Sequence, residues 1–367
     1  MGKEIKRTYA PFNEWKEKSK QTEYTKETPL LDKDGTLLAK GWARHNYFTY
    51  DRNLSKPSMR RKEWDFYQIV NDRYLVQISC ANISLGGYAG AKLVDWKSGE
   101  IICDSMAVFI GGKDKPEHVF PPKGDVPHRF RTNLGGAEID FNTKETERTL
   151  YFKFNYKGKP VECNFTMDIM PDLENITTVL PFKDMPTRYF MTTKQNCMPC
   201  EGTYKYGDDV YEFSKEDTFC ILDWGRVNTP YSMVWYWCNG TQYITDENGK
   251  KHIFGIEATW AIGDENHATE TCIFYDGKVH KVGAVDLKVF PKPDKYMQPW
   301  EFVSEDNRFN LVMKPVFDHH TDINALVMRM HCHQVCGICS GNVILDDGTK
   351  LEIKDLNLFC EYVENRW

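Results

Sequence analysis

The chain has 367 residues, of which 41% are hydrophobic, 27% charged and 14% aromatic, a composition that suits a globular protein rich in β-structure. Its net charge of −6 offers no broad basic surface, so we expect no nucleic-acid partner. No segment approaches the roughly 18 apolar residues of a spanning helix, and the polar N-terminus lacks the apolar region of a secretory signal. We therefore expect a cytoplasmic protein without a membrane span, whose 12 cysteines are reduced and mostly buried.

From about residue 65 onward the sequence alternates between apolar and polar residues, as strands with one buried face do. Residues 150–156 and 163–169 predict a hairpin around the turn Lys157–Pro160. Asn-Gly and Asp-Gly pairs favour tight turns between such strands. They occur at Asp34-Gly35, Asn239-Gly240, Asn248-Gly249, Asp276-Gly277 and Asp347-Gly348. An all-β antiparallel meander that curls into barrels, with few short helices, is expected.

The proline-containing segment Pro181–Pro186 interrupts this alternation and predicts a domain boundary. We expect an N-terminal extension over residues 1–24, a first barrel over 25–185 and a second over 186–367. Each part is long enough for a barrel with long loops. Strands do not alternate with helical segments, which argues against a doubly wound nucleotide-binding fold.

Residues 222–237 carry the pattern that most suggests a ligand site. In a strand, Trp235 and Trp237 point to one face and form a flat apolar wall. Buried against indoles, Asp223 could act as a general acid, unless Arg226 pairs with it and keeps it ionised. A structural ion pair among core tryptophans is the alternative. The candidate catalytic residues are Asp223 and Arg226, and the candidate substrate-binding residues are Trp224, Tyr231, Trp235 and Trp237.

A second polar cluster, residues 192–196, follows an apolar run. Lys194 and Asn196 would share a strand face, and a lysine inside a barrel could donate to a developing oxyanion; a surface lysine is the alternative. Lys194 is the third candidate catalytic residue. Glu270 could supply a second carboxylate beside Asp223, whereas a lone histidine such as His45 is more often structural. The further candidate substrate-binding residues are Gln195, Asn196, Glu270 and His45.

Residues 331–339 mix histidines with a Cys-x2-Cys pair, a spacing found in zinc sites, and a His-His pair lies upstream. In an alternating strand, however, His331 and His333 share a face opposite Cys332. Ligands on opposite faces cannot converge on one ion without a sharp turn, for which Gly337 is the only candidate. We therefore expect no metal here, and a zinc-stabilised module is the least favoured hypothesis.

Taken together, these motifs resemble a bacterial and fungal family known as domain of unknown function 2804. The family looks related to the tandem-lipocalin group of carotenoid hydratases (hydroxyneurosporene synthases) and Diels–Alderase-like cyclases. The resemblance implies two packed lipocalin-like (calycin) barrels with an apolar cavity near their junction, and chemistry without a redox cofactor or metal. It covers about residues 25–367 and rests on Gly41–Arg44, Arg61–Asp65, Lys194–Pro199, Leu222–Arg226, Trp235–Trp237, His333–Gly337, Ser340-Gly341 and Glu361.

The leading functional hypothesis is a cofactor-independent isomerase, cyclase or hydratase/lyase. Its substrate would be a bulky apolar unsaturated molecule such as a polyphenol, a polyene or a steroid-like compound. Asp223 would transfer the proton, Arg226 would set its pKa, and Lys194 would orient a substrate oxygen. The alternative is a lipid or pigment carrier without chemistry, because lipocalin barrels often only bind their ligands.

Overall fold

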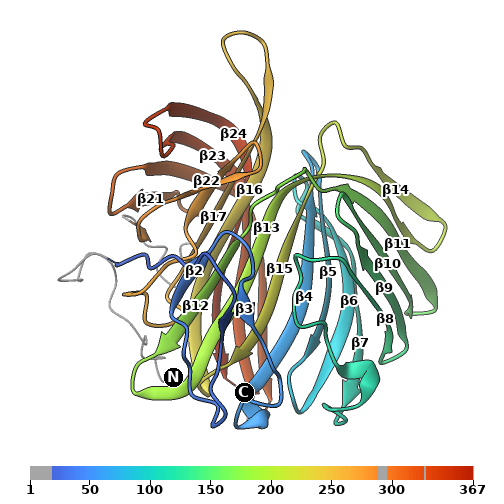
Figure 1. Ribbon diagram of the computed structural model, residues 1–367. Helices are drawn as coiled ribbons and strands as arrows, with labels where there is room; N and C mark the ends of the chain where they lie inside the picture. The colour runs from blue at the N-terminus through green and yellow to red at the C-terminus, as the bar shows by residue number, and fades with distance from the viewer. Residues whose placement is uncertain (1–18, 288–295, 326–327, 367) are drawn as a thin grey trace.

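The computed structural model describes residues 19–287, 296–325 and 328–366, and in these residues the regular structure is almost entirely antiparallel β-sheet. Two large curled sheets lie side by side, with β13, β15 and β16 near the middle of the molecule (Figure 1). The predicted all-β fold of two packed lipocalin-like barrels is confirmed. The described residues contain no helix that is long and apolar enough to cross a membrane.

The first sheet has 13 strands and forms the N-terminal barrel (Figure 1). Its main path runs β7-β6-β5-β4-β15-β13-β11-β10-β9-β8, and β2, β12 and β14 pair at its side. Its strands are β2 (Gly41–Ala43), β4 (Arg61–Val70), β5 (Tyr74–Asn82), β6 (Gly86–Asp95), β7 (Glu100–Ile110), β8 (His128–Leu134), β9 (Ala137–Thr143), β10 (Glu147–Tyr156), β11 (Lys159–Asp168), β12 (Ile176–Phe182), β13 (Met185–Tyr206), β14 (Asp209–Phe213) and β15 (Phe219–Asn228).

The second sheet has nine strands in the order β19-β18-β17-β16-β24-β23-β22-β21-β20. Its strands are β16 (Ser232–Thr245), β17 (Lys251–Trp260), β18 (Cys272–Tyr275), β19 (Lys278–Lys281), β20 (Val285–Leu287), β21 (Trp300–Ser304), β22 (Phe309–Ala325), β23 (Met328–Ile344) and β24 (Lys350–Arg366). The remaining elements are the short parallel pair β1 (Thr28–Pro29) and β3 (Phe48–Thr49) and the 3₁₀ turns η2 (Ser58–Arg60) and η3 (Pro116–His118).

The chain passes from the first sheet to the second at residues 229–231, between β15 and β16. The expected boundary at Pro181–Pro186 falls instead in the hairpin between β12 and β13, two strands that pair with each other. Residues 186–228 belong to the first sheet, because β13 and β15 fill the place between β11 and β4. Pro181 and Pro186 both lie inside strands, and only Lys183-Asp184 form the turn, so the prolines mark a hairpin and not the end of a domain.

The predicted hairpin at residues 150–169 is present as β10 and β11, joined at Lys157-Gly158. Four of the five predicted Gly turns lie at turns, but Asn239-Gly240 does not. These two residues lie within β16, where Gly240 pairs with both Ile256 and Leu358. A Cβ at Gly240 would come within 2.8 Å of a β24 carbonyl oxygen, so this glycine permits close strand approach instead of a turn.

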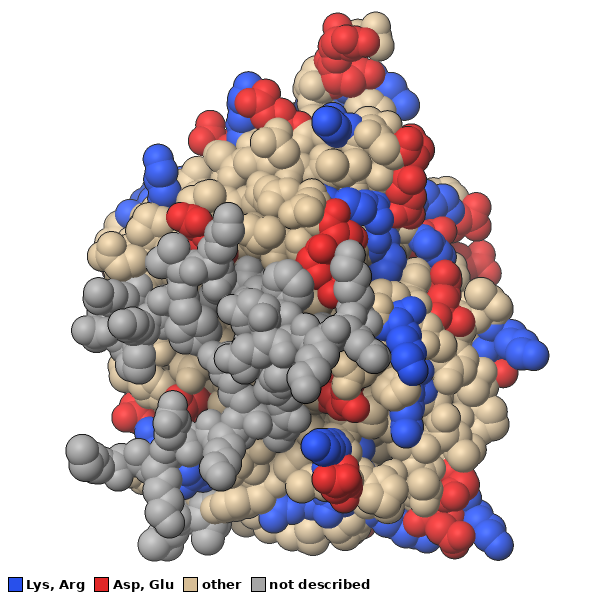
Figure 2. Space-filling model, turned by 90° about the vertical axis from the view of Figure 1, so that its left-hand side faces the viewer, with Lys and Arg blue, Asp and Glu red and all other residues tan. Residues whose placement is uncertain are grey.

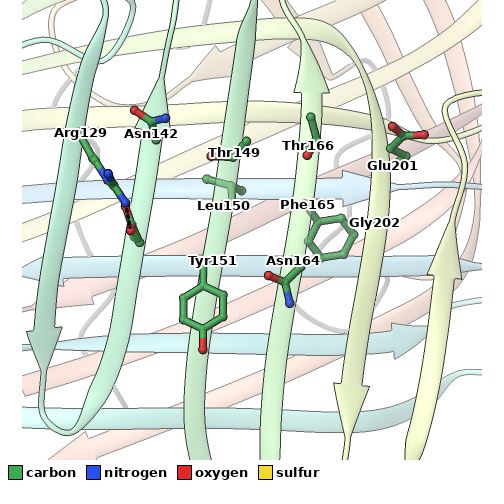
Figure 3. A pocket seen from close by; sticks show the side chains of 11 residues that line it. Arg129, Asn142, Thr149, Leu150, Tyr151, Asn164, Phe165, Thr166, Glu201 and Gly202 are labelled. Atoms are coloured by element: carbon green, nitrogen blue, oxygen red, sulfur yellow. Dashed lines mark hydrogen bonds and ion pairs between the residues drawn. The ribbon is translucent and has the colours of Figure 1, made fainter.

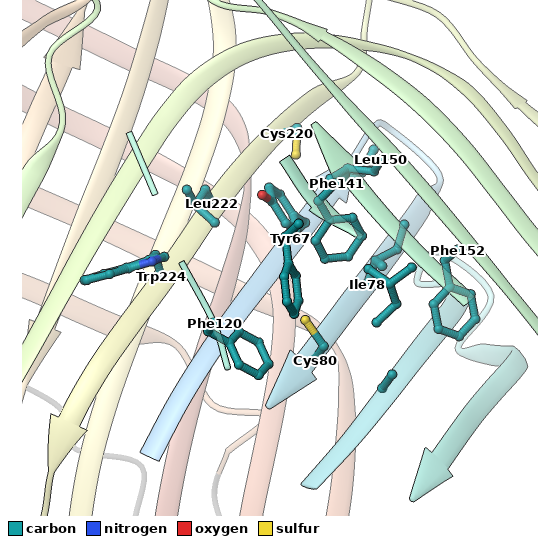
Figure 4. Packing of buried hydrophobic residues seen from close by; sticks show 14 of the residues in the cluster. Tyr67, Ile78, Cys80, Phe120, Phe141, Leu150, Phe152, Cys220, Leu222 and Trp224 are labelled. Carbon is teal, nitrogen blue, oxygen red and sulfur yellow. The ribbon is translucent and has the colours of Figure 1, made fainter. Parts of the chain in front are cut away.

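The interior of the first barrel is filled with side chains (Figure 4). Tyr67, Phe141 and Leu222 come from three different strands and pack together there. All 12 cysteines are free and buried, as expected for reduced thiols that act as small hydrophobic side chains. The barrel interior is therefore a packed core.

Two further apolar clusters join the two sheets. In one, Trp42 and Phe190 of the first sheet pack with Phe274 of the second. In the other, Trp96 packs with Phe359. Among the described residues on the face drawn in Figure 2, acidic and basic side chains are intermixed. The shared clusters make the junction between the sheets part of the core.

Candidate active site

A buried ion pair lies between the two sheets. Lys194 on β13 and Asp223 on β15 are direct cross-strand partners, and Lys194 Nζ lies 2.9 Å from Asp223 Oδ1. Only 4% of the Lys194 side chain and 13% of the Asp223 side chain are exposed. Trp237 reaches the pair from the second sheet, and its ring centroid lies 4.3 Å from Lys194 Nζ. Such a pair is costly to desolvate unless its partners are well placed.

The contact with the Asp223 carboxylate keeps Lys194 positively charged. Burial by itself lowers the pKa of Lys194, but the negative charge of Asp223 raises it above its usual value overall. The pair therefore consists of an ammonium and a carboxylate in a nearly dry environment. Interactions between charges are much stronger there than in water.

The predicted pairing of Asp223 with Arg226 does not occur. The two residues are three positions apart in one strand, so their side chains point to opposite faces of the sheet. Asp223 faces the second sheet, whereas Leu222 belongs to the core of the first barrel. Arg226 faces that barrel too and binds Asp65 there, with Nη2 2.9 Å from Oδ1.

Arg226 has a structural environment inside the first barrel. Its guanidinium also donates to the carbonyl oxygens of Trp64 and Pro121, at 2.7 Å each. A second buried arginine, Arg148, donates to Tyr67 Oη at 2.9 Å and to the predicted substrate-binding residue Gln195 at 2.8 Å. Trp224 packs in the same core beneath the Arg226 guanidinium. Arg226, Trp224 and Gln195 thus lie on the opposite side of the sheet from the Lys194–Asp223 pair.

Two buried carboxyl groups, Glu257 on β17 and Glu270 in the loop between β17 and β18, lie around Lys194. Burial raises the pKa of Glu257 on β17 well above its usual range, and the charge of Lys194 offsets only part of this. Burial also raises the pKa of Glu270, the candidate that we expected beside Asp223. The Trp237 indole donates to Glu257 Oε1. Among the described residues, none donates a hydrogen bond of normal geometry to either carboxyl oxygen of Glu270.

Glu257 was missed by the sequence reasoning. It is a lone acidic residue among the apolar side chains of β17, a pattern that could have singled it out as a buried carboxyl group. A fourth carboxyl group lies on β24, where Glu361 accepts bonds from Trp235 Nε1 at 3.0 Å and from Gln334 Nε2 at 2.9 Å. Burial raises the pKa of Glu361 as well.

The other predicted residues lie elsewhere. Asn196 ties the two sheets together, because its Nδ2 donates to the Ile256 carbonyl oxygen at 3.2 Å across the junction. Tyr231 is 45% exposed and lies against the Arg60 guanidinium. His45 lies at the end of β2 with its ring against Tyr47. Of the predicted set, Lys194, Asp223, Glu270, Trp235 and Trp237 meet at the junction.

Two hollows in the described residues differ in their place and size. A void of about 10 Å³, with room for about one water molecule, lies at the junction beside Trp96 and Phe359. A groove of about 400 Å³ lies on the outer face of β9–β11 and β13 (Figure 3). None of the residues that line it belongs to the charged cluster. It is lined mostly by polar side chains, among them Asn142, Asn164 and Tyr151.

Comparisons with known proteins place the chain in a family. A search of curated proteins finds no match. A structure from Nitrosomonas europaea described as a "putative AttH" is 8% identical, covers 83% of this chain and 92% of its own, and has a TM-score of 0.44. Kievitone hydratase from Nectria haematococca is 10% identical, covers 83% of this chain and 88% of its own, and has a TM-score of 0.43. Neither likeness is close enough to assign an activity. The family model described as "Domain of unknown function (DUF2804)" matches residues 21–367, and the chain therefore belongs to this family.

Proposed function

We propose that the chain is an acid/base enzyme of the hydratase or lyase type, with its reacting groups at the junction of the two sheets. The observation that carries the proposal is the buried Lys194–Asp223 ion pair beside two carboxyl groups whose pKa burial raises, Glu257 and Glu270. One ionised and one protonated carboxyl group in a single site is the arrangement that general base and general acid catalysis require.

Glu270 is the best placed proton donor of the two glutamates. Glu257 already accepts the indole proton of Trp237, which holds its carboxyl group in place. Glu270 is fully buried, and neither of its oxygens receives a hydrogen bond of normal geometry from the described residues. A buried polar group without such a partner is costly in a folded protein and is often found at a functional site.

For hydration of a carbon–carbon double bond, each group has one task. Glu270 gives its proton to one alkene carbon, and a water oxygen bonds to the other carbon. Asp223 accepts the proton that this water loses. Transfer of that proton from Asp223 to Glu270 restores the starting state. The net change is the addition of one water molecule to the double bond. Lys194 holds Asp223 in place through the 2.9 Å ion pair. Elimination of water follows the same path in reverse.

The side chains around the cluster favour an unsaturated substrate. Trp237 stands edge-on to Phe66 of the first sheet, with ring centroids 5.7 Å apart, and Trp235 packs in the same cluster. Aromatic rings offer flat apolar surfaces against which conjugated or ring-containing molecules stack. We therefore propose a polyene, or a phenolic compound that carries a carbon–carbon double bond, as the substrate class.

The Asp223→Asn variant tests the proposal. Purified full-length protein is incubated with a panel of polyenes and unsaturated phenols in isotopically labelled water, and products are detected by mass spectrometry. We expect the variant to lose at least about 100-fold in turnover, the usual size of a general-base contribution. Asp140→Asn is the matched control, because Asp140 is also ion-paired, with Arg129, but on the outer face.

Two outcomes would contradict this assignment. Turnover that survives in Asp223→Asn, with the variant folded by circular dichroism, excludes Asp223 as the base. A compound of the panel that binds tightly to the native protein and is recovered without incorporated label identifies the chain as a carrier.

A further inference from the structure

Three histidines on the second sheet lie close together on one hairpin. His320 is on β22, and His331 and His333 are on β23. His320 and His333 are direct cross-strand partners, and His331 shares their face because it is two residues from His333. His320 Nε2 lies 3.2 Å from His331 Nδ1, and one nitrogen from each ring can be chosen so that all three lie within 4.8 Å of one another.

These separations suit a common metal ion. Zinc–nitrogen bonds of about 2.0–2.1 Å in tetrahedral geometry place two ligand nitrogens roughly 3.3 Å apart. The His320–His331 pair already has this spacing. The rings of His320 and His333 are nearly parallel, with centroids 4.3 Å apart. The lone pair of an imidazole nitrogen lies in the plane of the ring, so His320 must turn out of this stack to share an ion with His333, and as an exposed side chain it is free to do so.

A second observation concerns the orientation of His333. Its Nδ1 donates to Asp318 Oδ2 at 2.8 Å, which leaves Nε2 with the free lone pair that a metal needs. Tyr296 stacks on the same ring with centroids 3.6 Å apart and fixes its plane. Histidine ligands of metals commonly donate their other ring nitrogen to a carboxylate in this way. The side chain is therefore oriented as a ligand and held there from two sides.

We propose that His320, His331 and His333 bind one divalent cation of the zinc class. Imidazole nitrogens suit zinc and its neighbours in the first transition series. Three protein ligands leave a fourth position, which in zinc enzymes holds water or substrate. Asp318 is a positioning residue in this proposal, since it acts through His333.

The proposed metal site is separate from the Lys194–Asp223 cluster. In β23 and β24, Gln334 and Glu361 bind each other on the face toward the first sheet, together with Lys92. His333 and its cross-strand neighbour Tyr362 point to the opposite face of the same strands. The inference therefore concerns a second site and does not depend on the proposed acid/base chemistry.

The sequence analysis disfavoured a metal here because its argument concerned ligands within one strand. The argument against Cys332 holds, since that residue lies on the other face from His331 and His333. The third ligand comes instead from β22, across the hairpin. Its position depends on the register of the two strands, which the sequence pattern does not give.

The test is a titration of the full-length, chelator-treated protein with Co²⁺, followed by competition with Zn²⁺. We expect one equivalent of Co²⁺ with the intense visible absorption of a tetrahedral ion and without the near-ultraviolet band of a thiolate ligand. His320→Asn and His331→Asn should each weaken Co²⁺ binding at least about 100-fold, and Asp318→Asn about 10–100-fold. His319→Asn is the matched control, because His319 points to the opposite face and contacts Lys92.

Three results would overturn the metal site. They are the absence of stoichiometric Co²⁺ binding, equal affinity in His320→Asn and the native protein, and a thiolate band that assigns the ion to cysteines. His320 is exposed, so its variant is expected to fold, and circular dichroism verifies this. Loss of this site would leave the Asp223→Asn experiment unaffected.

Discussion

Glu270 connects the stability of the fold with its proposed chemistry. The folded chain holds the Glu270 proton at pH values where an unfolded chain, with a pKa near 4.5, has released it. In that range the native state binds more protons than the unfolded state, so stability falls as pH rises. Below the unfolded pKa this penalty is absent.

Replacing Glu270 by Gln should therefore raise stability near neutral pH while it removes the proposed proton donor. We expect the melting temperature of Glu270→Gln to exceed that of the native protein at pH 7 and to approach it at about pH 4.5. Turnover should fall at the same time. Differential scanning fluorimetry across this pH range measures the first effect, and Glu247→Gln on an exposed turn is the control. A difference in melting temperature that does not depend on pH would contradict the prediction.

At the level of single residues, the sequence identified the chemical groups of the site better than it identified which groups pair. Lys194, Asp223, Glu270, Trp235 and Trp237 do come together at the junction, from β13, β15, β16 and the loop between β17 and β18. The partner assigned to Asp223 was wrong, although the spacing of three between Asp223 and Arg226 already placed them on opposite faces. The true partner, Lys194, is 29 positions away and could not be chosen without the register of β13 and β15.

Strand β15 carries the proposed base on one face and a structural arginine on the other. Arg226 neutralises Asp65 and binds the Pro121 carbonyl oxygen, so it fixes the loop that enters the first barrel. Substituting one member of a buried ion pair leaves the other charge uncompensated, which typically costs about 3–5 kcal/mol.

Arg226→Met should therefore destabilise the protein by roughly 3–5 kcal/mol. Arg226→Lys should recover only part of this loss, because an ammonium cannot reproduce the forked donors of a guanidinium. Chemical denaturation followed by circular dichroism measures both. Arg129→Met on the outer face is the matched control, since Arg129 pairs with an acidic residue while more than half exposed. Equal stability of Arg226→Met and the native protein would show that the barrel interior does not need this charge.

The sequence predicted individual strands correctly where apolar and polar residues alternate without interruption. The β10–β11 hairpin follows directly from alternation on either side of a glycine turn. The turn predicted at Asn239-Gly240 was wrong. A glycine can allow either a tight turn or a close approach of two backbones, and the sequence does not distinguish the two. The same limit applies to the histidines of β22 and β23, whose meeting depends on strand register.

At the level of the whole molecule, the two sheets should unfold together. Trp237 contacts Lys194 and Phe66 of the first sheet and Phe359 of the second, so one side chain belongs to the packing of both. Gln68 Nε2 donates to Asn239 Oδ1 across the same junction at 2.7 Å. Local opening of one sheet would break these contacts.

We expect tryptophan fluorescence and far-ultraviolet circular dichroism to report one coincident unfolding transition. Trp237→Ala should lower the free energy of unfolding by roughly 3–5 kcal/mol, as large-to-small core substitutions do. Tyr151→Ala in the outer groove, by comparison, should have little effect. Two separated transitions in the native protein would mean that the sheets are independent folding units.

The place of β13 and β15 has a practical consequence for dividing this protein. A fragment truncated after residue 185 would lack both strands, leaving β4 and β11 without the neighbours that separate them in the intact sheet. Each strand would then expose a row of unpaired backbone N–H and C=O groups, and such exposed edges promote aggregation. A cut at residues 229–231 keeps all the hydrogen-bonded ladders of both sheets intact. Fragment complementation and limited proteolysis should therefore be designed around that linker.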